Sequence, residues 1–180
     1  MIEPVDCSKG SIENNGTVVV DRVADILERE LQKLIEAWLT RVQQEPDLIN
    51  ILLNHEERTG HLPHLIHDVI IRLRLEAGTK APISKAAAFH GDLRHKQGYT
   101  VAMMVEESRL LQVSIFTILH ENVKHLEYSA LLPDVVTIAD EVDAQLKEQI
   151  LRFMAAEDIE NTKGKLHDIG RIKQNAKPRA

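Results

Sequence analysis

The stretch at residues 100–124, TVAMMVEESRLLQVSIFTILHENVK, carries apolar side chains at steps of three and four residues. This spacing places one group of residues along a single side of an α-helix: Val101, Met104, Val105, Ser108, Leu111, Ile115 and Leu119. A second group falls on about the opposite side: Met103, Leu110, Val113 and Thr117. A surface helix has one apolar stripe, so we expect this helix to be covered on two sides. The cover is either the rest of the monomer or a second copy of the chain.

Helical spacing recurs on both sides of this stretch. It predicts a first helix from Asp21, its N-cap, through Trp38, and Pro46 either ends this segment or begins a short second one through Leu53. Further helices are predicted over residues 62–73 and 84–97, the latter with Ser84 as N-cap and Gly98 at its end. A last helix is expected from Ser129 to Met154, with Pro133 in its first turn. We find no alternating strand pattern. The fold class is therefore all-α with five or six helices, either globin-like or a plainer helical bundle, because both use this periodicity.

The helical spacing also predicts which face is buried in two of these helices. For residues 84–97 this face is Ala86, Phe89, His90 and Leu93. For the last helix it is Leu132, Val135, Ala139, Val142, Leu146, Ile150 and Phe153, with Glu141 and Gln145 among the polar residues opposite. Residues 1–20 are interpreted as a flexible lead-in and 21–154 as the helical domain. Residues 155–180, with six basic and four acidic side chains, are interpreted as a polar tail or linker, flexible or only partly helical.

Composition excludes several classes of protein. A chain of 180 residues with 43% apolar and 28% charged residues suits one globular domain. Aromatic residues make up 3% and the net charge is −6, which argues against base-stacking modules and nucleic-acid binding. A single cysteine, Cys7, permits neither an internal disulfide nor a cysteine-based zinc site. We recognise no secretory signal and no membrane-spanning stretch, so a cytoplasmic protein is expected.

Several histidines are spaced closely enough to be considered as metal ligands. His61, His64 and His67 are spaced by three residues, and His55 lies nearby. The helical wheel turns His64 and His67 away from the apolar stripe, and no carboxylate or cysteine completes a familiar spacing. We therefore expect exposed polar positions, no metal site and no cofactor.

Few residues suggest chemistry of another kind. His90 lies on the expected apolar side of its helix, where it is satisfied by a neighbour, takes part in sensing or ligand binding, or ligates haem. Glu106, Glu107 and Arg109 lie off the main stripe, where a surface ion pair is the usual outcome. The chain has no nucleophile arrangement and no glycine-rich phosphate loop, so we expect no enzyme activity.

Two stretches resemble a known family. They are HGDLRHKQGYTVAMMVEESRLLQVSIFTILHENV at 90–123 and YSALLPDVVTIADEVDAQLKEQI at 128–150, and the most specific residues are His90, Arg94, Gly98, Tyr99, Glu106, Glu107 and Arg109. Together they resemble the RsbRD N-terminal sensory domain family, which precedes STAS modules in stressosome-type proteins and, in a similar version, histidine-kinase transmitters. The resemblance implies a non-catalytic helical input domain, with a globin-like fold that carries no haem in stressosome relatives.

The expected function is thus a regulatory sensor or input domain of bacterial signal transduction. Neither a transmitter nor a STAS module follows within the 180 residues, so the output would belong to a longer chain or to a partner protein. We expect a homodimer that signals through its helices, with dimer or transmission residues Leu110, Val113, Ala139, Val142, Leu146 and Phe153. The alternatives are a haem- or tetrapyrrole-binding domain using His90, a metal-dependent enzyme built on the histidines, and a purely structural interaction module.

The candidate ligand-binding or signalling residues are His90, Arg94, Tyr99, Glu106 and Arg109. Arg94 favours a carboxylate or phosphate group, or an internal glutamate for which Glu106 is the candidate. In the simplest alternative, these side chains only tie two helices together across the turn at Gly98.

Overall fold

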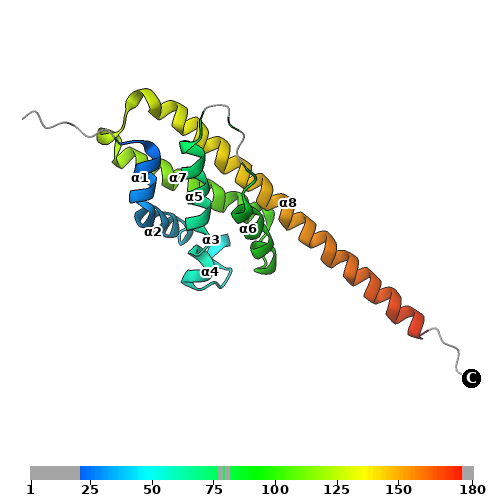
Figure 1. Ribbon diagram of the computed structural model, residues 1–180. Helices are drawn as coiled ribbons and strands as arrows, with labels where there is room; N and C mark the ends of the chain where they lie inside the picture. The colour runs from blue at the N-terminus through cyan, green and yellow to red at the C-terminus, as the bar shows by residue number, and fades with distance from the viewer. Residues whose placement is uncertain (1–20, 77–78, 80–81, 176–180) are drawn as a thin grey trace, which may run out of the picture.

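The computed structural model describes residues 21–76, 79 and 82–175, with side chains as far as residue 164. This part of the chain consists of eight α-helices and one 3₁₀ helix, with no strand beyond an isolated bridge between Asp21 and Leu126. The helices are α1 (Val23–Arg29), α2 (Leu31–Val42), α3 (Pro46–Ile49), α4 (His55–Thr59), α5 (Leu62–Arg74), α6 (Lys85–Lys96), α7 (Val101–Glu121), η1 (Val123–His125) and α8 (Tyr128–Asn175) (Figure 1). The all-α prediction is confirmed as a helical bundle.

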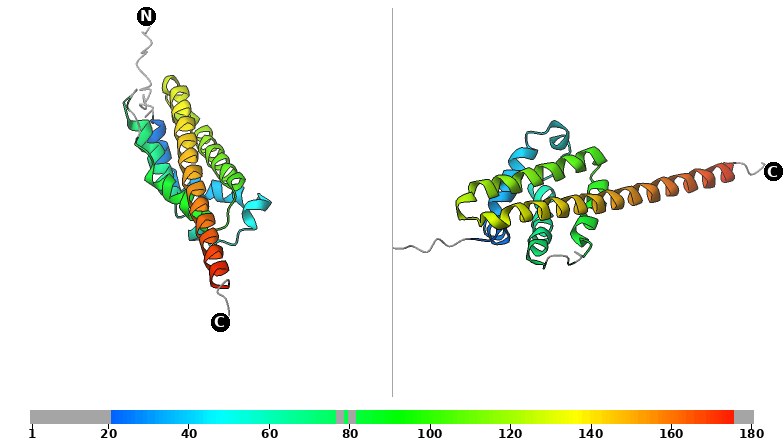
Figure 2. Two further views of the ribbon diagram at one scale, coloured as in Figure 1. Left: turned by 90° about the vertical axis from the view of Figure 1, so that its right-hand side faces the viewer. Right: turned by 90° about the horizontal axis from the view of Figure 1, so that it is seen from above.

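The long helix α8 organises the bundle. It crosses one side of the molecule and packs against α5, α6 and α7 (Figure 1). Helices α7 and α8 run antiparallel and are joined through η1 (Figure 2). Beyond the other helices α8 projects as a single exposed helix, and Phe153 is its last buried side chain among those described. Residues 155–175, which were expected in a flexible or only partly helical tail, continue α8 as far as Asn175.

The buried residues of α7 form one broad face, and of the group expected on the opposite side only Leu110 is buried, whereas Met103, Val113 and Thr117 are half-buried. The buried residues are Met104, Glu107, Leu110, Leu111, Ser114, Ile115, Ile118 and Leu119. Helices α1 and α2 cover one part of this surface and α8 another, so the cover belongs to the same chain. Val101 and Val105, expected in the main stripe, are exposed near the first turn of α7.

The helix expected over residues 21–38 is interrupted. The backbone leaves helical geometry at Glu30, with φ −95° and ψ 13°, which divides it into α1 and α2. The two halves then pack mainly on different neighbours, α1 on α5 and α2 on α7. The N-cap position of α1 is Arg22, not Asp21, and it makes no capping hydrogen bond through its side chain. Ser84, by contrast, caps α6 as predicted, because its Oγ accepts from the Ala87 amide at 2.9 Å.

The inner faces of α6 and α8 differ from the prediction. In α6 the buried residues are Ala87, His90, Gly91 and Arg94, one position away from the expected stripe, and Phe89 is 64% exposed. In α8 they are Ile138, Glu141, Val142, Gln145, Gln149 and Phe153, while Leu132 is 70% exposed. The amide of Gln145 donates to the Leu65 carbonyl at 3.1 Å and to Glu141 Oε1 at 3.1 Å. Polar groups therefore occupy part of this interface because they find partners there.

Three of the six residues expected to form a dimer seam or to transmit a signal face the interior of the single chain. Leu110, Val142 and Phe153 are buried within the single chain, so their side chains are not available to a second copy. The other three candidates, Val113, Ala139 and Leu146, are half-buried.

Two further expectations concern the ends of the chain and the membrane. The lead-in at residues 1–20 lies outside the described residues. No helix in the described part of the chain combines the length and apolar character that crossing a membrane requires.

Candidate functional site

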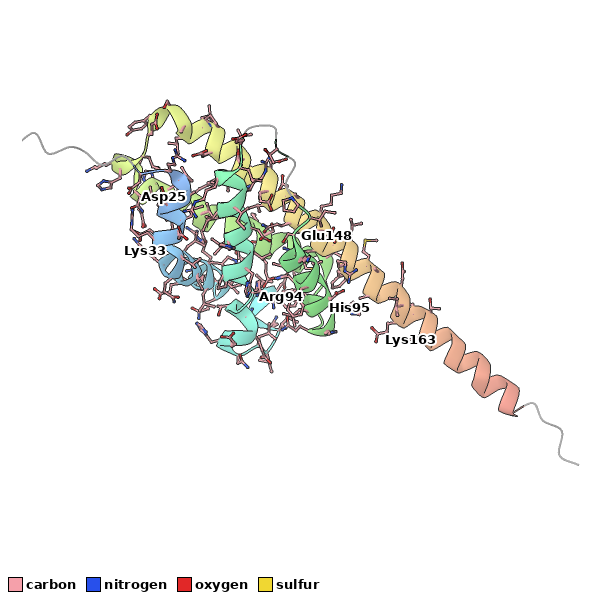
Figure 3. All side chains as sticks on the ribbon, viewed as in Figure 1. Asp25, Lys33, Arg94, His95, Glu148 and Lys163 are labelled. Carbon is pink, nitrogen blue, oxygen red and sulfur yellow. The ribbon has the colours of Figure 1, made fainter. Side chains whose placement is uncertain are left out.

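A buried ion pair joins α6 to α7. Arg94, 0% exposed, donates from Nε to Glu107 Oε2 at 2.9 Å and from Nη2 to Glu107 Oε1 at 2.9 Å. This bidentate geometry is the strongest form of guanidinium–carboxylate pairing. Burial raises the pKa of Glu107, and the Arg94 charge and the hydrogen bonds to the carboxylate oppose that rise. Figure 3 shows Arg94 inside the helical body.

Neighbouring groups form the remaining hydrogen bonds of Arg94 and Glu107. Tyr99 donates from its hydroxyl to Glu107 Oε1 at 2.8 Å, and its ring lies 4.5 Å from the Arg94 guanidinium carbon. The remaining Arg94 hydrogen bonds go to Gln97 Oε1 at 2.6 Å and to the carbonyls of Glu57 and Arg58 at 3.3 Å. Burial and the adjacent Glu107 carboxylate raise the pKa of Tyr99, so it stays a donor. The network therefore ties α4, α6 and α7 together.

Glu107 also links this network to the first helices through its backbone. The indole of Trp38, which is buried in α2, donates from Nε1 to the Glu107 carbonyl at 3.2 Å.

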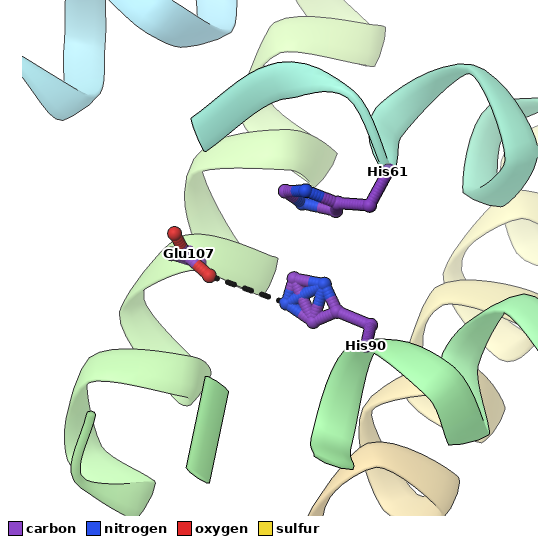
Figure 4. A group of neighbouring side chains, drawn as sticks. All are labelled: His61, His90 and Glu107. Carbon is purple, nitrogen blue, oxygen red and sulfur yellow. Dashed lines mark ion pairs between the residues drawn. The ribbon is translucent and has the colours of Figure 1, made fainter. Parts of the chain in front are cut away.

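Two buried histidines lie beside the same carboxylate. His90 comes from α6 and His61 directly precedes α5, and their ring centroids are 4.0 Å apart. His90 Nε2 is 3.4 Å from Glu107 Oε2 (Figure 4). Burial, and then the Arg94 charge, lowers the pKa of His90 to about 3, and burial lowers the pKa of His61 well below its usual value. Both rings are neutral near pH 7, and the Nδ1 atoms of both are buried without a hydrogen-bond partner.

The space at these histidines is small. A cavity of about 10 Å³ is lined by His61, His90 and Glu107, together with residues of α2, α5, α7 and α8. This volume holds about one water molecule. In the described part of the chain, the cavity beside His90 is far smaller than a porphyrin requires.

A larger pocket of about 750 Å³ opens between α5 and α6. Apolar side chains on its wall include Ile71, Ile83, Phe89 and Leu93, and the polar ones include His64, His67, Asp68, Arg72 and Glu141. His61 lines both this pocket and the small cavity behind it. A pocket of this size and mixed lining suits a small organic molecule.

The structure brings together only part of the expected site. His90, Arg94 and Tyr99 lie in one network, as the predicted tie between helices requires. The carboxylate that completes the tie is Glu107, however, and not the expected Glu106. Glu106 accepts from Arg109 on the surface of α7, where Arg109 also lies 3.8 Å from Glu45. The predicted surface ion pair is thus confirmed for Glu106 and Arg109 and is wrong for Glu107.

From the sequence, Glu107 and His61 were expected at the surface, and the structure buries both. Glu107 follows Met104 by three residues and precedes Leu111 by four, so its place on the buried side of α7 was detectable. For His61 no such signal exists, because it precedes the periodic part of α5. The exposure predicted for His64 and His67 is confirmed, and both line the larger pocket.

No protein-family model, curated protein or solved structure matches the chain. The resemblance to the RsbRD N-terminal domain and the globin-like arrangement stay predictions.

Proposed function

We propose that this chain is a regulatory input domain of bacterial signal transduction, of the histidine-kinase or stressosome type, without catalytic activity of its own. A small molecule entering the pocket between α5 and α6 changes the packing of α6, and α8 passes the change on. The observation that carries this proposal is that α6 forms a wall of the pocket and also packs directly on α8.

The contact between α6 and α8 is close enough to transmit a small displacement. A Cβ atom placed on Gly91 would lie 2.2 Å from the Gln149 carbonyl oxygen, so the two backbones meet with no side chain between them. Further along, the His95 and Phe153 rings pack edge to face with centroids 5.2 Å apart, and Arg152 pairs with Asp92 at 3.1 Å. Packed interfaces of this kind shift as units instead of deforming gradually.

The projecting part of α8 is the output in this proposal. Its side chains from Met154 to Gly164 are mostly exposed, and Figure 3 shows Lys163 on this projection. A kinase transmitter or a STAS-type partner would receive the change there, and a homodimer would present two such helices. Light scattering across a size-exclusion peak checks the dimer, because the mass would be about twice 20.4 kDa.

Hydrogen exchange tests the coupling between pocket and helix. Ala86→Trp fills the pocket from α6, and Ala102→Trp adds the same side chain at an exposed position of α7 outside the pocket. We expect Ala86→Trp, but not Ala102→Trp, to change amide exchange in α8 around residues 145–156. Equal exchange in the two variants and the unsubstituted chain would contradict the proposal.

A thermal-shift screen tests the sensor role itself. Small carboxylates, amines and phosphates are added to the unsubstituted chain and to both variants. We expect a compound that raises the melting temperature of the unsubstituted chain and of Ala102→Trp, but not of Ala86→Trp.

A further inference from the structure

His61, His90 and Glu107 meet in the interior although they come from three separate parts of the chain. One ligand atom from each residue lies within 4.8 Å of the other two, and all three residues are buried (Figure 4). We propose that this cluster binds a divalent transition-metal ion of the zinc class. Of the histidines that the sequence suggested as a metal cluster by their spacing, only His61 belongs to this site, and the proposal differs from the expectation that the chain binds no metal.

The donor set fits such an ion. Two neutral imidazoles and one carboxylate are ligands that Zn²⁺ and its neighbours in the first transition row accept, usually with water in an open position. Donors about 2.0–2.1 Å from a tetrahedral ion lie roughly 3.3 Å from one another. His90 Nε2 and Glu107 Oε2 are already 3.4 Å apart, so the remaining donor, from His61, needs the larger part of the movement.

The unpartnered nitrogens are the second observation. Nδ1 of His61 and Nδ1 of His90 have no hydrogen-bond partner, and both atoms are shielded from solvent. A buried polar atom without a partner costs about 1–3 kcal/mol, so native interiors rarely keep two side by side. Coordination would use one nitrogen of each ring, Nε2 in His90, and leave two ring nitrogens beside the cavity that accommodates one water molecule.

The residues around the cluster orient the Glu107 carboxylate, but their positive charge repels a cation. Arg94 and Tyr99 hold Glu107 by three hydrogen bonds, which orients it as the outer partners of metal ligands do. This buried region already holds the guanidinium groups of Arg94 and Arg58 beside the single carboxylate of Glu107, so a divalent ion adds further positive charge. We therefore expect weaker binding than in closed structural zinc sites.

This inference is separate from the proposed function, because the ion can bind whether or not the larger pocket takes a ligand. The probe is Co²⁺, whose visible absorption reports its coordination, titrated into the chelator-treated full chain. We expect one ion per chain, displaced by Zn²⁺. The double variant His64→Ala/His67→Ala keeps the folded interior and removes the exposed histidines of α5, and it should bind Co²⁺ unchanged.

His61→Gln and His90→Gln should each lower the affinity for Co²⁺ by more than about 100-fold. Loss of a residue that only orients a ligand typically costs roughly 10–100-fold, and loss of the ligand itself should cost more. Circular dichroism identifies a variant that fails to fold. For that case, X-ray absorption of the Zn²⁺-loaded unsubstituted chain provides an independent test, with two imidazoles and oxygen donors expected. Absence of one-to-one binding by the unsubstituted chain would overturn the proposal. So would loss of binding in the His64→Ala/His67→Ala variant, which would identify an adventitious surface site.

Discussion

At the scale of single residues, the adjacent glutamates of α7 show how position alone decides the role of a side chain. Glu106 pairs with Arg109 at the surface, where ion pairs contribute little because water screens them. Glu107, 100° further around the helix, is 4% exposed and provides the carboxylate for a fully buried arginine. The two residues therefore form a matched pair for experiment.

Glu107→Gln should lower the free energy of unfolding by about 3 kcal/mol, because it leaves the Arg94 charge buried without a counter-charge. Glu106→Gln should change it by less than about 0.5 kcal/mol. Urea unfolding followed by circular dichroism measures both values. Similar losses in the two variants would contradict the assignment of Glu107 as the partner of Arg94.

Glu141 predicts a pH dependence of stability. Burial raises its pKa, against the opposing hydrogen bond from Gln145, so the folded chain holds this proton to higher pH than the unfolded chain does. The contribution of Glu141 to stability is thus greatest below pH 4.5 and falls as the pH rises through its folded-state pKa. Glu141→Gln keeps an oxygen acceptor for Gln145 and removes the ionisation.

We therefore expect Glu141→Gln to unfold at a higher temperature than the unsubstituted chain at pH 7–8. The difference should vanish near pH 4, where both side chains are neutral. Calorimetric scans across this range provide the measurement. An advantage of the variant that grows as the pH falls would show that the sign is wrong.

At the scale of elements, the crossing of α6 over α8 depends on the missing side chain of Gly91. Its hydrogen faces the backbone of Gln149, and a methyl group there would push the helices apart. Gly164, in the projecting part of α8, has no atom within 4 Å of the position of its added Cβ. The same substitution should therefore have opposite effects at the two sites.

Gly91→Ala should destabilise the chain by about 1–3 kcal/mol, the usual cost of overpacking. Gly164→Ala should stabilise α8 by up to about 1 kcal/mol, because alanine loses less backbone freedom in a helix. Thermal unfolding of both variants tests the contact. Tolerance of alanine at Gly91 would show that the helices lie further apart.

At the scale of the whole molecule, α8 has two parts with different energetics. Up to Phe153 it contributes buried side chains to the bundle, whereas the described side chains after it are exposed or half-buried. An isolated helix of this kind gains little from packing and depends on its junction with the folded body.

A chain that ends at Ala156 should therefore keep a cooperative unfolding transition within a few degrees of that of the full chain. Phe153→Ala in the full chain should cost about 3 kcal/mol, because it removes a buried aromatic ring and its contact with His95. Differential scanning calorimetry compares the two. Collapse of the transition on truncation would mean that the projecting segment stabilises the body.

Local pattern by itself determined the helical class of this protein. The three- and four-residue spacing around residues 100–124 predicted a long helix, and Ser84 predicted the start of α6. Both are confirmed, because periodicity and capping depend on neighbours within one or two turns. The tie between His90, Arg94 and Tyr99 was also predictable, since these residues flank the short turn at Gly98.

Only the tertiary structure decided which faces turn inward and which groups meet. The inner faces of α6 and α8 include Gly91, Glu141, Gln145 and Gln149, which hydrophobicity would not select. Gly91 is buried where its backbone crosses that of Gln149, and Gln145 is buried where it donates to the Leu65 carbonyl of α5. His61 and His90 lie 29 positions apart in the sequence and 4.0 Å apart between ring centroids. Such a contact depends on how α5, α6 and α7 pack. The periodicity within one helix does not specify which other helices it will contact.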